Sequence, residues 1–177
     1  MSEVADLTAL AGRHHDWVER MGWHNKTTLE TLGLIGTEIV EAQEEILLYQ
    51  ELPLHLKPAC YDGFWTRLSE EMADITLRLM DLSVTAGFDL TVIAERAGPS
   101  AWKSRVAENA IAELLIDWKQ CMNAARKAKL DEDFMQKFGR LVRRVLDYAE
   151  VVEMDLLGEV LRKMAINAEN GTRGRLM

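Results

Sequence analysis

Two pairs of acidic residues have the types and the spacing best suited to chemistry in this sequence. Glu38 and Glu41 are three residues apart in one predicted helix, and Glu71 and Asp74 are three residues apart in the next. Residues spaced i, i+3 share a helix face, so two packed helices can bring all four carboxylates together. Four ionised carboxylates at one point need a cation, and Mg²⁺ is the oxygen-binding ion that proteins share with substrate phosphates. The spacing predicts a metal site that handles a phosphorylated small molecule.

A solvated helix face is the alternative explanation for the same acids. On such a face Asp74 would pair with Arg78, four residues later, and a pair of this kind contributes only ~0.2–0.5 kcal/mol. Against this, Glu38 and Glu45 lie on a stripe along one helix face that has apolar residues at both ends. Apolar residues also flank Asp74. Acids in apolar surroundings favour an interior cleft, but the sequence alone leaves both interpretations open.

The elements that must position these acids are helices. Helix formers are abundant, Pro occurs only 3 times, and 48% of the 177 residues are hydrophobic, which is enough for a sizeable core. Apolar residues at 3/4 spacing predict three long helices and a short one, over 4–21, 27–52, 64–86 and from 89 onward. Thr27 and Glu30 form a capping-box pattern, and a loop over 51–63 contains Pro53 and Pro58. We therefore predict an all-α helical bundle.

The second half of the chain reads as a diverged copy of the first. A Gly98-Pro99 break separates the two predicted halves, 1–98 and 99–177. Superposing Met154-Asp155-Leu156 on Phe88-Asp89-Leu90 shifts the sequence by 66 residues (154 − 88 = 66) and lays one apolar stripe over another. We predict that the second half packs on the first and has no metal site of its own. A chance match between two helical stripes is the alternative.

In this alignment the copy has basic residues where the first half is acidic. Asp74 falls on Arg140, within a basic stripe that ends at Arg144. Arg140 is therefore a candidate for contacting substrate phosphates or for facing the acidic cleft. The alternative is ordinary surface pairing of this stripe with Glu113 or Asp117.

A polar and aromatic segment precedes the first acidic helix. Trp23, His24 and Asn25 combine aromatic rings with an amide, a set that can stack on a nucleobase and hydrogen-bond its edge. Core packing and helix capping explain the same residues equally well. The four His residues do not have metal-ligand spacing with the acids, and the absence of a Glu-x-x-His motif disfavours a ferritin-like di-iron bundle.

Composition removes several other classes of function. A formal net charge of −8 argues against general nucleic-acid binding, which needs Lys and Arg to neutralise phosphates. No segment has the ~18 apolar residues of a membrane span, and the first ten residues do not resemble a signal peptide. Cys60 and Cys121 lack the spacing of a disulfide framework or a zinc site. We expect a cytoplasmic protein with no nucleic-acid or membrane partner.

The order of the two acidic motifs resembles that of a known superfamily. Glu38-Ile-Val-Glu41 followed by Glu71-Met-Ala-Asp74 is similar to the E-x-x-E and E-x-x-D signature of the all-α nucleoside triphosphate pyrophosphohydrolases, which include MazG-like proteins and dimeric dUTPases. The surrounding segments 34–42 and 87–90 also resemble that family. The likeness covers roughly residues 17–90, and it implies a MazG-like bundle.

The resemblance also implies an activity and its ligands. Members hydrolyse a nucleoside triphosphate to the monophosphate and pyrophosphate, as homodimers, with Mg²⁺, or Mn²⁺ in its place, held by the four acids that carry catalysis. Lys163, Asn167 and Arg173 are similar to the segment by which members contact the nucleotide. The dUTPase likeness favours a pyrimidine deoxynucleotide such as dUTP or dCTP as the small-molecule substrate.

The sequence departs from the family pattern in two respects. Many members have a further Glu where this chain has Thr37, and Glu45, one turn after Glu41, is the candidate replacement ligand. The second half is longer than the minimal family unit requires. A helical-bundle binding or regulatory protein that kept the fold and lost the chemistry is therefore the competing hypothesis.

Overall fold

The computed structural model describes residues 3–23, 27–98, 107–127 and 130–170. Within these ranges the chain forms helices and no strands, namely α1 (Glu3–Arg20), α2 (Thr28–Glu51), α3 (Lys57–Thr85), α4 (Leu90–Ala97), α5 (Ala107–Ala125), α6 (Glu132–Val151) and α7 (Leu156–Asn170). The predicted all-α bundle is confirmed. None of the described helices combines the length and the apolar character needed to cross a membrane.

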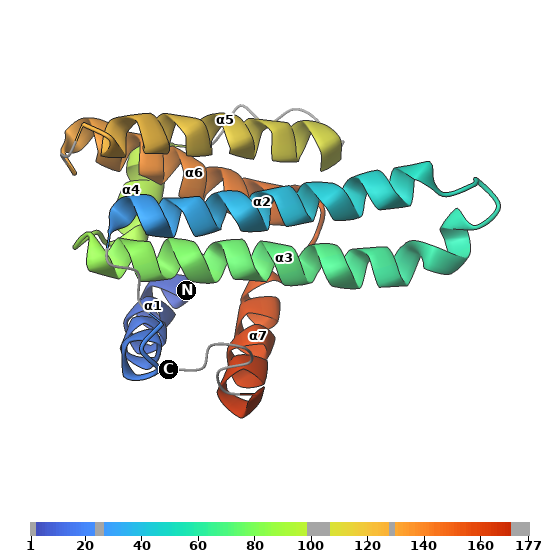
Figure 1. Cartoon of the computed structure of the whole chain (residues 1–177), viewed down its shortest axis with the longest axis horizontal. Coiled ribbons are helices and arrows are strands. Elements are labelled where there is room, and N and C mark those ends of the chain that lie inside the picture. The colour runs from blue at the N-terminus through green and yellow to red at the C-terminus, as the bar shows by residue number, and fades with distance from the viewer. Residues whose placement is uncertain (1–2, 24–26, 99–106, 128–129, 171–177) are drawn as a thin grey trace.

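The two acidic helices, α2 and α3, form a long antiparallel hairpin at the centre of the molecule (Figure 1). The α5 helix packs on α2 and on α6, while α4 packs on α6. On the other side of the hairpin, α1 and α7 both contact α3. The acids of α2 and α3 are therefore neighbours, and a helix from the far end of the chain lies over them.

Local signals set the start of α2 where the sequence predicts it. The Thr27 hydroxyl accepts from the Glu30 N–H at 3.2 Å, and the Glu30 carboxylate accepts from the Thr27 N–H at 2.9 Å. The predicted start of the third helix is wrong, because α3 begins at Lys57 and includes much of the supposed loop. Pro58 lies in the first turn of α3, where a helix has no use for the missing N–H, so proline does not stop it.

The turns after α3 and after α6 have the same hydrogen bonds, 66 residues apart. The N–H of Phe88 donates to the carbonyl five residues earlier at 2.7 Å, and the N–H of Met154 does the same at 2.8 Å. The preceding residues, Gly87 and Glu153, both have left-handed backbones, with φ of 71° and 57°. Glycine adopts this conformation freely whereas glutamate does not. The turn after α6 therefore has the same backbone shape although it has no glycine at this position.

The helices that follow these two turns, α4 and α7, begin with the same kind of cap, and each packs on a helix of the other predicted half. Asp89 accepts from the Val92 N–H at 3.0 Å, and Asp155 accepts from the Gly158 N–H at 2.9 Å. Beyond these caps α4 packs on α6, and α7 packs on α3. The division at 1–98 and 99–177 stays a prediction, and the matching turns and reciprocal packing add support to it.

One continuous apolar core joins the helices of both predicted halves. It includes Ile39, Leu68 and Phe134, all fully buried. The α4 and α6 backbones approach each other closely at Gly139, where a Cβ atom would lie 2.4 Å from the carbonyl oxygen of Ile93. Only a residue without a side chain permits that distance, so the position of α4 depends on this glycine.

Candidate active site

Three of the predicted acids converge between α2 and α3. Carboxylate oxygens of Glu38, Glu71 and Asp74 all lie within 4.8 Å of one another. The side chains of Glu38 and Asp74 are only 12% and 21% exposed. The i, i+3 spacing in α3 places Glu71 and Asp74 on the face that meets α2, so the carboxylates share a partly buried point rather than a solvated surface.

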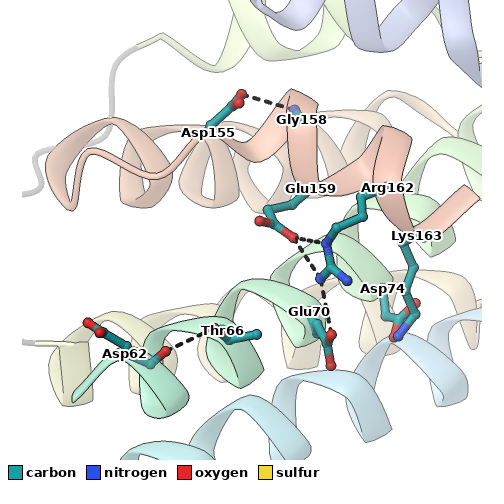
Figure 2. Close-up of polar contacts among 9 residues, drawn as sticks. All are labelled: Asp62, Thr66, Glu70, Asp74, Asp155, Gly158, Glu159, Arg162 and Lys163. Carbon is teal, nitrogen blue, oxygen red and sulfur yellow. Dashed lines mark hydrogen bonds and ion pairs between the residues drawn. The ribbon is translucent and has the colours of Figure 1, made fainter. Parts of the chain in front are cut away.

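Two cations of the chain reach this carboxylate trio. Lys163 of α7 places its Nζ 2.5 Å from Oδ2 of Asp74 (Figure 2), and Arg78 of α3 places its Nε 3.3 Å from Oε1 of Glu38. The Asp74–Arg78 surface pair considered from the sequence is therefore replaced by two ion pairs that each cross between helices. A carboxylate with a dedicated cation is stabilised in its charged form.

The electrostatics of the trio favour an added positive charge. Burial raises the pKa of Glu71 to about 7, and the nearby charges of Asp74, Glu41 and Glu38 act in the same direction. Burial also raises the pKa of Glu38 and of Asp74, although Arg78 and Lys163 respectively oppose those shifts. Burial is the largest cause of all three shifts, so the trio holds carboxylates whose charge is poorly solvated.

The donor set of the trio fits a hard divalent cation. Each of the three residues offers a carboxylate oxygen, the ligand type that Mg²⁺ and Mn²⁺ prefer, and the oxygens are close enough to share one ion. No sulfur or imidazole donor belongs to this cluster within the described residues. The trio could therefore hold a metal ion, with Glu38 supplied by α2 and the other two ligands by α3.

A cavity of about 230 Å³ opens beside the trio. Glu38, Asp74, Lys163 and Asn167 form part of its lining, and His14, Trp17 and Trp23 form an aromatic part. The rings of Trp17 and Trp23 meet edge to face with centroids 4.8 Å apart. The cavity therefore combines charged groups with flat apolar walls, which suits a ligand that has an anionic part and an aromatic part.

His14 is the polar group of the aromatic wall. Its side chain is buried, and its Nδ1 has no hydrogen-bond partner among the described residues. Burial lowers the pKa of His14 to about 4, against the opposing charge of Asp81, so the imidazole is neutral at pH 7. A neutral imidazole has one donor and one acceptor nitrogen, and a buried unsatisfied nitrogen is typical of a site completed by a ligand.

The sequence anticipated part of this constellation. Trp23 lies far from Lys163 and Asn167 in the chain, yet all three line the same cavity as Glu38 and Asp74. Their roles as substrate contacts stay predictions. His24, Asn25 and Arg173, predicted for the same task, lie outside the described residues.

Two of the predicted metal ligands do not join the trio. Glu41 lies one turn along α2 from Glu38 and is exposed, and its charge acts on Glu71 without its oxygen belonging to the 4.8 Å cluster. The Glu45 carboxylate instead accepts from the Arg67 Nε at 2.5 Å. Glu45 is thus held by a surface arginine and does not replace the acid missing at Thr37.

Arg140 is not where the sequence interpretation placed it. Its Nη2 donates to Oε1 of Gln120 in α5 at 2.8 Å, so its partner belongs to the α5–α6 pair and not to the acidic cluster. Arg144 of the same stripe bonds to Glu113 and, at 2.8 Å, to Asp117. The prediction that Arg140 faces the cleft is wrong, because α6 packs on α4 and α5 while the trio faces α7.

The sequence interpretation missed His14 and Arg78 as members of the site. His14 lies at 3/4 spacing with apolar residues of the first predicted helix, a pattern that indicates a core position. Arg78 was read as a surface partner of the acid four residues before it. A polar residue within an apolar stripe is the signal that was available for His14.

The raised pKa of Glu71 predicts how pH changes stability. The folded state holds this proton up to pH about 7, whereas an unfolded glutamate loses it near pH 4.5, so stability falls as pH rises between those values. We expect the free energy of unfolding of Glu71→Gln, relative to that of the wild type, to rise by roughly 1–2 kcal/mol as the pH goes from 5 to 8 in a chelating buffer. This figure is discounted for solvent screening. Urea unfolding at several pH values measures the difference.

The control for that measurement is Glu45→Gln, whose acid is paired outside the trio. This variant should follow the wild type within about 0.5 kcal/mol at every pH. Excess Mg²⁺ at pH 8 should stabilise the wild type and fail to stabilise Glu71→Gln. Parallel stability curves for wild type and Glu71→Gln would contradict the assignment of this charge to the trio.

Comparison with known proteins does not add an identity to this geometry. No protein-family model, no curated protein and no solved structure matches the chain.

Proposed function

We propose that this protein is a metal-dependent nucleoside triphosphate pyrophosphohydrolase, which releases pyrophosphate and a nucleoside monophosphate. The observation that carries the proposal is a single cavity lined by two members of the carboxylate trio, Glu38 and Asp74, by a lysine and by an aromatic wall. These are the groups needed to bind a cation, phosphates and a base in one place. The acidic motifs, similar to those of the MazG-like and dimeric dUTPase superfamily, add the reaction type.

Each group has a role in this proposal. Glu38, Glu71 and Asp74 hold Mg²⁺, which when bound neutralises charge on the phosphates and favours attack of water at the α-phosphorus. Lys163 and Asn167 line the cavity on the α7 side and contact the phosphates.

The aromatic wall is the proposed nucleobase site. Trp17 and Trp23 offer faces for stacking, and the neutral His14 offers a hydrogen bond to the edge of a base. The likeness to dimeric dUTPases favours a pyrimidine deoxynucleotide such as dUTP or dCTP as the substrate. A homodimer, as in the resembling family, is part of the proposal.

A nucleotide panel tests the proposal directly. Purified protein is incubated with each NTP and dNTP, with and without Mg²⁺, and pyrophosphate and free phosphate are measured separately. We expect Mg²⁺-dependent pyrophosphate from one or a few pyrimidine nucleotides and no free phosphate. Light scattering of the same sample gives the oligomeric state. Absence of turnover across the panel would overturn the enzymatic proposal and favour a binding or regulatory bundle.

A further inference from the structure

Two adjacent cations of α7 have different partners in α3. Arg162 places Nη2 3.1 Å from Oε1 of Glu70 and 2.8 Å from Oε2 of Glu159 (Figure 2), and neither acid belongs to the carboxylate trio. Lys163 contacts Asp74, which does belong to it. Arg162 therefore ties α7 to α3 outside the trio, whereas Lys163 neutralises a residue within it.

Lys163 and a divalent cation compete for the same carboxylate. The Lys163 Nζ lies 2.5 Å from Oδ2 of Asp74, and an ion bound by the trio would sit roughly 2.0–2.1 Å from its ligand oxygens. Two positive centres so close together in a partly buried site repel strongly, because the surroundings screen them less than water does. A cation at the trio therefore weakens the hold of Asp74 on Lys163, through repulsion and by drawing on the same carboxylate charge.

The chain allows Lys163 to move without moving α7. Its ammonium is on a flexible four-carbon stem, while the packing of α7 on α3 and the Arg162–Glu70 ion pair hold the helix in place. Lys163 lines the cavity beside Asn167, one turn later on α7. An ammonium released from Asp74 thus remains within reach of an anion bound in the cavity.

We propose, on the basis of the function proposed above, that Lys163 is a displaceable counter-ion. It neutralises Asp74 before a divalent cation binds, and it transfers to a phosphate group of the ligand when the cation takes its place. The site then holds a positive charge near Asp74 at all times. Lys163 opposes binding of the cation alone and favours binding of the cation together with a phosphate ligand, so the two ligands bind cooperatively.

Two binding measurements on three proteins test this coupling. Wild type, Lys163→Met and the matched control Arg162→Met are titrated with Mn²⁺ alone, and bound Mn²⁺ is followed by electron paramagnetic resonance. We expect Lys163→Met to bind Mn²⁺ about tenfold more tightly than the wild type, because the competing charge is gone. Arg162→Met should bind it within about twofold of the wild type, since its partners lie outside the trio.

The second measurement uses inorganic pyrophosphate at saturating Mg²⁺, with tryptophan fluorescence as the readout because Trp17 and Trp23 line the cavity. Lys163→Met should bind pyrophosphate at least about tenfold more weakly than the wild type, and Arg162→Met should be unaffected. Opposite effects of one substitution on the two ligands are the signature of a transferred counter-ion. A lysine that stayed on Asp74 would also repel the cation, so the accompanying loss of pyrophosphate affinity is what distinguishes transfer from a fixed counter-ion.

The outcomes separate this proposal from the one it rests on. Mn²⁺ bound equally by wild type and Lys163→Met, or unchanged pyrophosphate affinity, overturns the counter-ion role and leaves the metal site standing. Absence of Mn²⁺ binding in all three proteins overturns the metal-dependent function itself. Should Lys163→Met lose its cooperative melt by circular dichroism, Lys163→Gln repeats both titrations with the same expected changes, because its amide is uncharged and still hydrogen-bonds Asp74.

Discussion

Asp74→Asn is expected to lower kcat/KM for pyrophosphate release by at least about 10³-fold and to leave the helical content unchanged. Asp74 is both a member of the carboxylate trio and the partner of Lys163, so the amide weakens cation binding and leaves the lysine without its counter-charge. Steady-state kinetics on the preferred nucleotide, with circular dichroism on the same protein, measures the effect.

Glu45→Gln is the matched control on α2, since its acid contacts Arg67 rather than the trio. It should keep activity within about threefold of the wild type. Glu41→Gln should fall between the two, because Glu41 acts on the trio through its charge and not through a shared ligand position. Wild-type turnover by Asp74→Asn, or a loss in Glu45→Gln as large as in Asp74→Asn, would contradict the assigned ligands.

The largest effect on stability is expected from Gly139→Ala. The added Cβ would lie 2.4 Å from the backbone oxygen of Ile93, and a backbone atom cannot move aside as the end of a flexible side chain can. The α4 and α6 helices must separate, which should lower the free energy of unfolding by about 2–3 kcal/mol. Urea unfolding followed by circular dichroism gives this value from the shift in the midpoint.

Gly12→Ala in α1 is the control, because nothing lies within 4 Å of the added Cβ. Alanine is the better helix former, so this variant should gain roughly 0.5–1 kcal/mol. The same chemical change then has opposite signs at two helical positions. A stable Gly139→Ala protein would show that the α4–α6 approach is looser than the structure indicates.

The start of α2 and the short helix after α3 could be predicted from sequence because local groups determine them. The Thr27 and Glu30 side chains satisfy backbone groups within one turn, and Asp89 caps the next residues in the same way. The start of α3 could not be placed, since Pro58 is compatible both with a loop and with a first helical turn.

The acidic helix face was predicted correctly, and the ligand set within it was not. Glu45 is on the same side of α2 as Glu38 but about 10 Å farther along the axis, because each residue rises ~1.5 Å. Glu41 is closer but exposed, although the same i, i+3 spacing brings Glu71 and Asp74 together on α3. The spacing of acids along the sequence does not show which of them come close together in space. That depends on how α3 packs against α2.

Long-range partners were the least accessible to sequence reasoning. The resemblance marked Lys163 as a nucleotide contact, but its contact with Asp74 depends on α7 crossing over α3. The role predicted for Arg140 failed for the same reason, and the alternative pairing of its stripe with Glu113 or Asp117 is what Arg144 makes. Both outcomes depend on how helices far apart in sequence pack.

The crossing of α7 over α3 constrains how this chain can evolve. A gene truncated after Gly98 would still encode every carboxylate of the trio, but it would lose Lys163 and Asn167 from the same cavity. Residues 1–98 alone would therefore keep the proposed ligands of the ion and lose the α7 side of the cavity. A change in α7 can alter the acidic site although every carboxylate of the trio lies in α2 or α3.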